Sequence, residues 1–125
     1  MTEIAFTVWE FVRIMVRLET VAATAPSGAQ AALLAEWREV WSELDAELGV
    51  LGEEDPEAMQ ALMLDHDLRI ACPAGLMPPL MQTVAEVIAE MRIAMDGADP
   101  DLRAALAAEV EALDALRRRL DPGPA

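Results

Sequence analysis

The stretch 34–51, LAEWREVWSELDAELGVL, is the part of the sequence that most directly indicates the fold. Its large apolar residues recur at steps of three and four positions, which is the spacing of one face of an α-helix, and acidic residues occupy the other face. Ser27 and Gln30 have the spacing of a capping box, and Gly49 or Gly52 supplies a stop, so we predict a helix between these points. The apolar face comprises Leu34, Trp37, Trp41, Leu44, Leu48 and Leu51.

The same periodicity predicts further helices on either side of this stretch. Two of them begin at an aspartate followed by a proline, Asp55-Pro56 and Asp99-Pro100, which are a favoured N-cap and a favoured first helical residue. Pro73 ends one predicted helix and Gly97 ends the next. The predicted ranges are about 3–24, 56–72, 79–95 and 100–120.

No strand candidate of any length stands out, and the connections between the predicted helices are short. Short connections favour antiparallel packing of neighbouring helices. We therefore predict an all-α protein, an antiparallel up-and-down bundle of four to five helices that forms a single domain over residues 1–125. Residues 121–125 are expected to be a frayed tail.

The sequence is both acidic and apolar, with 54% hydrophobic residues and a net charge of −14. A negative field of this size repels nucleic-acid phosphates and anionic lipid, so we expect no nucleic acid and no membrane as a partner. No uncharged run approaches the roughly 20 residues of a membrane span. Cys72 is the single cysteine, and the start MTEIAFTVWE lacks the positive charge of a secretory leader, so we expect a cytoplasmic protein.

The first predicted helix, 3–24, is apolar on more than one side. A small bundle does not cover so much apolar surface by itself. We therefore predict that the protein is not an enzyme, and that it forms a homodimer or binds a protein partner through apolar helix faces. One apolar stripe comprises Ile4, Val8, Phe11, Met15, Leu18 and Ala22, and the second comprises Ala5, Trp9, Val12 and Val16.

The one histidine, His66, lies in the predicted helix 56–72, whose two opposite faces are both apolar. If the face with Leu64 and Leu68 enters the core, His66 lies on the outside with Arg69 one helical turn away. A neutral imidazole can accept a phosphoryl group, and a nearby cation offsets the arriving charge. His66 and Arg69 are therefore a candidate catalytic pair, surrounded by a candidate partner-binding face. That face comprises Met59, Leu62, Met63 and Ile70.

This segment resembles the histidine-containing phosphotransfer domains of bacterial phosphorelays, which are small and often acidic helical bundles. Their signature is His, any residue, Leu or Ile, Lys or Arg, Gly, and then small residues. His66-Asp67-Leu68-Arg69 meets the first four positions, and Ala71-Cys72 provides the small pair. Gly75 and Leu80 fall close to a further glycine and leucine of the family. The resemblance covers about residues 30–120 and implies that a receiver-domain aspartate donates a phosphoryl group to His66.

The sequence also departs from that pattern. Ile70 stands where the family has a glycine, and Asp65 and Asp67 place negative charge on both sides of the histidine. The same four residues are similar to the His-Glu/Asp-Leu-Arg box of histidine-kinase dimerisation domains, but the proline expected five residues after the histidine is absent.

Other interpretations of these residues stay open. His66 can face the core or a subunit interface, hydrogen-bonded to a carboxylate or a carbonyl. Methionine pairs at four-residue spacing can hold Cu(I), with His66 and Cys72 as further ligands, although methionine also fills irregular cores. The several His or Cys ligands of a conventional metal site are missing, so we predict no metal and no cofactor. The charge also allows an acidic decoy of a basic surface. The methionine pairs are Met59/Met63, Met77/Met81 and Met91/Met95.

Overall fold

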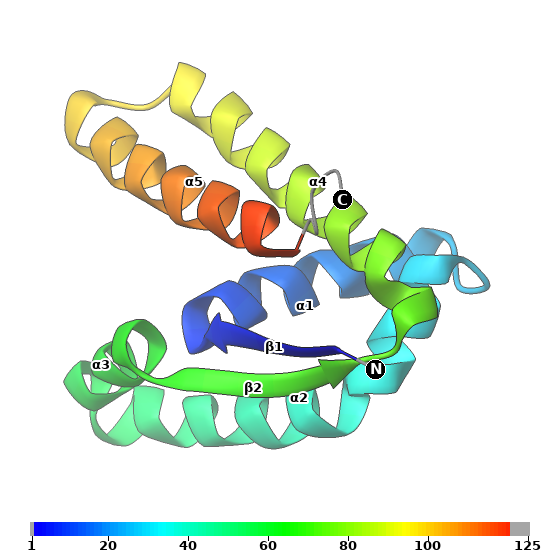
Figure 1. Ribbon diagram of the computed structural model, residues 1–125. Helices are drawn as coiled ribbons and strands as arrows, with labels where there is room; N and C mark the ends of the chain where they lie inside the picture. Colours follow the sequence, from blue (N-terminus) through cyan, green and yellow to red (C-terminus); the bar gives the residue numbers. More distant parts are fainter. Residues whose placement is uncertain (1, 121–125) are drawn as a thin grey trace.

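The computed structural model of the chain describes residues 2–120 (Figure 1). Within this range the chain is mostly helical, as predicted, and two short strands pair into a small antiparallel ribbon. The predicted frayed tail at 121–125 lies outside the described residues. In chain order the elements are β1 (Thr2–Thr7), α1 (Val8–Thr24), α2 (Ala29–Glu54), α3 (Pro56–Asp65), β2 (Asp67–Cys72), the short 3-10 helix η1 (Ala74–Leu76), α4 (Met77–Asp96) and α5 (Pro100–Leu120).

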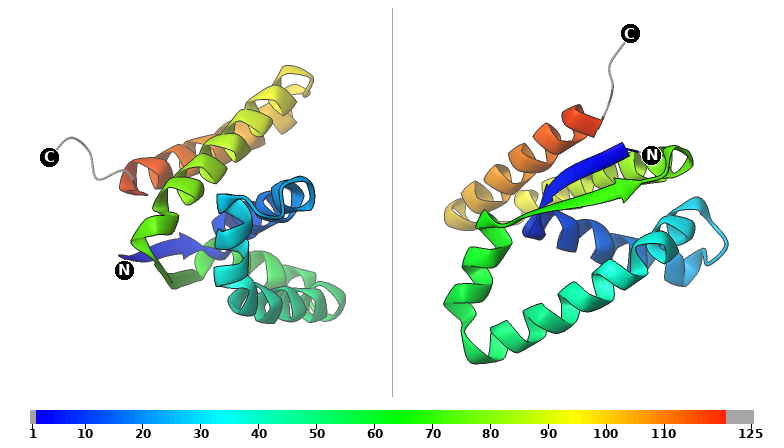
Figure 2. Two further views of the ribbon diagram at one scale, coloured as in Figure 1. Left: turned by 90° about the vertical axis from the view of Figure 1, so that its right-hand side faces the viewer. Right: turned by 60° about the horizontal axis from the view of Figure 1, so that its bottom comes forward.

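The helices form two arms that meet at α1. The upper arm is the hairpin of α4 and α5, and the lower arm contains α2 and α3 with the ribbon above them (Figure 1). The two arms diverge towards the end where α3 and the tip of the α4–α5 hairpin lie, as the further views in Figure 2 also show. α1 contacts α2, α3 and α4, so it lies between the arms and joins them.

The two strands correct the predicted helix boundaries. The helix predicted over 3–24 begins only at Val8, and the helix predicted over 56–72 ends at Asp65. In both segments, residues 2–7 and 67–72, buried and exposed side chains alternate with the two-residue period of a strand, and they do not follow the 3.6-residue period of a helix. Thr7 and Glu10 form a reciprocal capping box at the start of α1, so the helix has a defined first residue. The buried strand residues are Ile4, Phe6, Ile70 and Cys72.

An aromatic cluster attaches the ribbon to the helices. Ile4 lies opposite Ile70 and Phe6 lies opposite Leu68 in the strand register. The ring centroid of Phe6 is 5.8 Å from that of Trp37 on α2 and 6.0 Å from that of Phe11 on α1. Such tilted and edge-on pairs add to the apolar burial of the rings.

A hydrogen bond fixes the other strand to α2. The buried Trp37 indole donates from Nε1 to the carbonyl oxygen of Ala71 across 3.1 Å. The same ring therefore contacts β1 through Phe6 and bonds the backbone of β2. This satisfies a polar group that burial would otherwise leave unpaired.

The core lies along the side of α1 that faces the other helices. Phe11, Ile14, Met15 and Leu18 of α1 are fully buried. They pack with buried leucines and valines of α2, α4 and α5 in one continuous cluster. Among the described helices, none combines the length and the apolar character that crossing a bilayer requires.

We predict that Ile70→Ala lowers the free energy of unfolding by about 2–5 kcal/mol, because it removes a buried strand side chain and leaves a cavity. Ile93→Ala is the matched control, since Ile93 is 72% exposed on α4 whereas Ile70 is 8% exposed. Its effect should stay within about 0.5 kcal/mol. Urea denaturation followed by circular dichroism measures both variants, and equal effects would contradict the burial of the β2 side chains.

Candidate functional site

His66 is the C-cap residue of α3, not a residue in the middle of a helix. Its amide donates to the carbonyl of Leu62, and its own carbonyl accepts the amide of Val8, both across 3.1 Å. The backbone of His66 therefore joins the end of α3 to the start of α1. The side chain is exposed.

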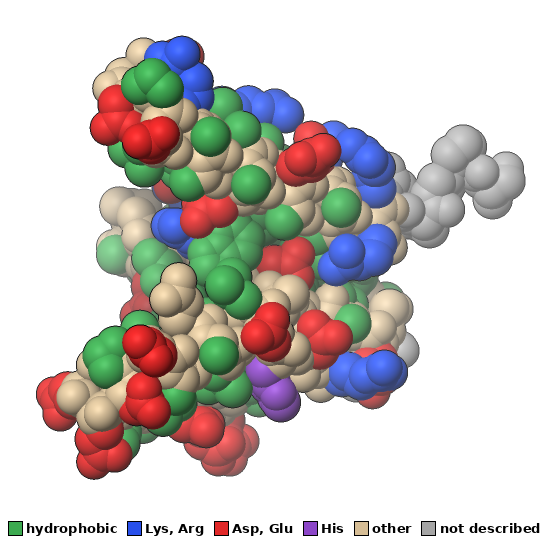
Figure 3. Space-filling model, turned by 90° about the vertical axis from the view of Figure 1, so that its left-hand side faces the viewer, with side chains coloured by type: hydrophobic (Ala, Val, Ile, Leu, Met, Phe, Trp, Pro, Cys, Tyr) green, Lys and Arg blue, Asp and Glu red, His purple; other side chains and the backbone are tan. Residues whose placement is uncertain are grey.

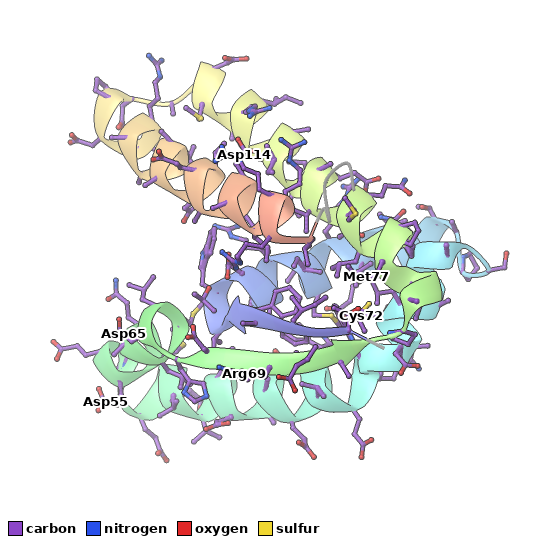
Figure 4. The ribbon with its side chains drawn as sticks, in the orientation of Figure 1. Asp55, Asp65, Arg69, Cys72, Met77 and Asp114 are labelled. Carbon is purple, nitrogen blue, oxygen red and sulfur yellow. The ribbon has the colours of Figure 1, made fainter. Side chains whose placement is uncertain are left out.

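Arg69 does not flank the imidazole in the predicted way. That prediction placed Arg69 one helical turn after His66, but the backbone at His66 is extended and Arg69 lies in β2 (Figure 4). Side chains three residues apart on extended backbone point to opposite sides. Arg69 instead forms an exposed ion pair with Glu3 of β1, at 3.6 Å.

The surroundings of His66 disfavour a phosphoryl group. The C-terminal end of a helix carries the negative end of the helix dipole, and α3 ends beside His66. Asp65 and Asp67 are both exposed next to it and add negative charge. The geometry therefore gives phosphotransfer no support beyond the access of solvent to the ring, and the roles assigned to His66 and Arg69 stay predictions.

The predicted partner-binding face of Met59, Leu62, Met63 and Ile70 is divided between different surroundings. Ile70 is buried in β2, so its place on a common helical face was wrong because α3 ends before it. Met59 lies against Gly52 of α2, and Leu62 packs half-buried on the core. Met63 is the member that reaches an open surface hollow.

That hollow surface lies between the two arms, and we call it the Trp9 groove. It consists of two adjoining hollows of about 260 and 370 Å³ that share Trp9 and Met63. Figure 3 looks into the opening between the arms, where hydrophobic side chains gather over its floor. The apolar residues that line it are Trp9, Val12 and Val16 of α1, Met63 and Leu64 of α3, Val87 and Met91 of α4, and Ala108 and Ala112 of α5.

The charged residues in the groove are paired with one another. Arg13 of α1 lies over the Trp9 ring, with its guanidinium carbon 5.5 Å from the ring centroid. It also forms an ion pair with Glu109 of α5 at 3.4 Å. Arg17, one turn later on α1, pairs with Glu90 of α4. These pairs hold the upper arm to α1.

Glu86 of α4 is the centre of a partly buried polar cluster next to the groove. Its Oε1 accepts from Arg17 Nε at 3.0 Å and from Gln30 Nε2 at 3.1 Å, and its Oε2 accepts from Gln82 at 3.1 Å. Burial alone raises the pKa of this carboxyl, but the three hydrogen bonds together hold the pKa below its ordinary value. Gln30 also donates to the buried Thr83, so the cluster connects α1, α2 and α4.

The structure excludes a Cu(I) site that contains both His66 and Cys72. His66 and Cys72 are six residues apart along extended chain, which is roughly 20 Å. One ion therefore cannot bind both. Cys72 is also buried, and burial together with the nearby Glu36 raises the pKa of its thiol, which disfavours the thiolate. Among residues 2–120, no three His, Cys, Asp or Glu side chains are grouped as metal ligands.

The residues of the groove were only partly visible in the sequence. Trp9, Val12 and Val16 form the second apolar stripe that the sequence predicts for the first helix. The sequence does not indicate the α5 wall, formed by Ala108 and Ala112, because alanine is common on every face of a helix.

Comparisons of this chain with family models, with curated proteins and with solved structures found no match.

We predict that the Glu86 cluster makes stability depend on acid pH. A carboxyl whose pKa is lowered by folding stabilises the protein above its unfolded pKa, and this contribution is lost as the pH falls through the folded value. Glu86→Gln should therefore be less stable than the wild type at pH 7, and the difference should shrink as the solution is acidified below about pH 4.

Urea denaturation at a series of pH values measures this difference. Glu39→Gln controls for the change in net charge, because Glu39 is exposed and forms no ion pair with the described residues. A Glu86→Gln difference that is constant from pH 7 to acid would show that the hydrogen bonds to Glu86 do not stabilise its charge.

Proposed function

We propose that this protein is a non-catalytic binding module whose Trp9 groove receives a helix of a protein partner. The observation that carries the proposal is the second side of α1. Its first side is fully buried in the core, whereas Val16 on the second side is 51% exposed and Trp9 and Val12 are only half-buried. Leu64, on the opposite wall of the groove, is 60% exposed. Large apolar side chains gathered in one concavity are typical of a binding surface.

The dimensions and chemistry of the groove favour a protein over a small molecule. The hollow of about 260 Å³ lies below the roughly 300–1,000 Å³ of small-molecule sites, and the hollow of about 370 Å³ lies near the lower end of that range. Arg13, Arg17 and their glutamate partners are engaged in holding helices together, so they are not poised to act on a substrate. Hollows of this size suit the anchoring side chains of a larger partner.

A helix is the partner element that the groove accommodates best. The walls are themselves helices, α3 on one side and α4 with α5 on the other, with α1 as the floor. An amphipathic helix can place its apolar stripe into such a channel. Met63 and Met91 are flexible side chains that adapt to the shape of the inserted residues.

Homodimerisation is the second way to cover the groove, and it stays a prediction. A net charge of −14 opposes the approach of two copies at low ionic strength. The receiver domain implied by the phosphotransfer resemblance also stays a prediction, since its proposed contact depends on His66.

We predict that amphipathic helices selected from a displayed peptide library bind the wild-type chain and lose at least about tenfold in affinity for Val16→Glu. The introduced carboxylate would lose its hydration beneath the docked helix, and the neighbouring Arg13 and Arg17 already pair with glutamates, so the cost exceeds the roughly 1.4 kcal/mol that a tenfold change represents. Titration of the purified protein with each selected peptide measures the affinity.

Val50→Glu is the matched control. Val50 is also a helical valine, and it is 54% exposed on α2 outside the groove. The proposal fails if no helix binds, or if both variants weaken binding equally. Light scattering across a dilution series, run on the same three proteins, separates peptide binding from self-association that competes for the groove.

A further inference from the structure

We infer that the helix received by the Trp9 groove carries a basic polar face beside its apolar stripe. This inference rests on the proposed function and adds the chemistry of the partner. The observation behind it is the uneven distribution of charge between the two arms (Figure 3).

The negative charge is concentrated in α2 and α3, which we call the acidic arm. Residues 29–65 contain ten Asp and Glu residues but only one basic residue, Arg38. This stretch therefore contributes −9 of the net charge of −14. Asp55 and Asp65 lie at the two ends of α3, at the outer end of this arm (Figure 4).

The carboxylates of the acidic arm are not neutralised by the protein itself. Within residues 2–120, no ion pair involves an Asp or Glu of the acidic arm. On α4 and α5, by contrast, Glu86, Glu90, Glu109 and Asp114 each pair with an arginine. The negative field of the acidic arm thus remains directed to solvent and to whatever docks beside it.

One carboxylate of the acidic arm, that of Glu57, lies next to the groove. Glu57 precedes Gln60 by three residues and Leu64 by seven on α3, so all three belong to one side of the helix. Gln60 and Leu64 line the groove, and Glu57 is exposed at the same edge. A helix with its apolar stripe over Trp9 would bring its flanking polar residues alongside Glu57. Lysine or arginine at those positions would gain an ion pair, and glutamate would be repelled.

Other occupants fit this charge pattern less well. A second copy of the chain carries the same acidic arm, so its approach over α3 meets like charge. An acidic or neutral helix could use the apolar floor but would leave the carboxylates of the acidic arm without a partner. A basic amphipathic helix matches both the apolar floor and the acidic edge.

Three synthetic helices test the inference. Each has about 18 residues, or five turns, with the same leucine and methionine stripe, and the polar face is lysine-rich, glutamine-rich or glutamate-rich. We expect the lysine peptide to bind at least about tenfold more tightly than the glutamate peptide at about 0.05 M salt, because lysine gains an ion pair of about 0.2–1 kcal/mol beside Glu57 whereas glutamate is repelled there and by the net charge of the protein. The ratio should shrink at about 0.3 M salt, where the field is screened.

A matched pair of variants separates the edge of the groove from the overall charge. Glu57→Gln should weaken binding of the lysine peptide by about 1.5- to 5-fold and leave the glutamine peptide unchanged. Glu39→Gln removes the same charge at a position roughly 20 Å along α2 from the end of that helix at Glu54. This distance exceeds the screening length, so the variant should change the affinity of neither the lysine peptide nor the glutamine peptide. Circular dichroism confirms that both variants keep their helix content.

The outcomes distinguish the two proposals. If all three peptides bind equally and Val16→Glu abolishes binding, the basic partner is overturned and the proposed function survives. If Glu57→Gln and Glu39→Gln have the same effect, the preference comes from net charge alone and the inference about the groove edge is overturned. If no peptide binding depends on Val16, the proposed function itself is overturned.

Discussion

The packing of Phe6, Phe11 and Trp37 is the interaction on which the arrangement of the molecule depends. These rings come from β1, α1 and α2, and the Trp37 indole also bonds the backbone of β2. The cluster therefore ties together four segments, of which the most distant is separated from the first by more than half of the described chain. The cluster holds β1 against α1 and α2, and the Thr7–Glu10 capping box then starts α1 at Val8.

The position of α1 explains why a groove exists. One side of the helix is buried in the core, so the other side faces the space between α3 and the α4–α5 hairpin. Arg13 and Arg17 bridge from α1 to the upper arm through Glu109, Glu86 and Glu90. These ties hold the α4–α5 hairpin against α1 while the acidic arm forms none of them. The result is an apolar channel with ion-paired charges on the α4–α5 wall and the exposed Glu57 at the edge of the α3 wall, which is the physical basis of both proposals.

The sequence predicted the helical elements well where strong local signals exist. Asp55-Pro56 and Asp99-Pro100 start helices as expected, since an aspartate N-cap followed by proline needs no tertiary contact to favour a helix. The two strands were missed for the opposite reason. Each has six residues, and short apolar runs fit a helical stripe and a strand alternation equally well. The Thr7 and Glu10 capping pair was a signal in the sequence that could have placed the first boundary.

The candidate site, like the fold, combines features that local sequence signals predict with features that depend on distant contacts. By itself the sequence determined the helical class, the excess apolar surface of the first helix and the acidic character of the middle of the chain, because these follow from residue types and their spacing. Only the tertiary structure decided that Ile70 is buried, that His66 and Arg69 are on extended backbone, and that Trp9, Met63 and Ala112 share one hollow. Residues 2–7 pair with residues 67–72, and distant helices pack together, through contacts between segments far apart in the sequence. Local periodicity does not indicate which distant segment provides such a contact.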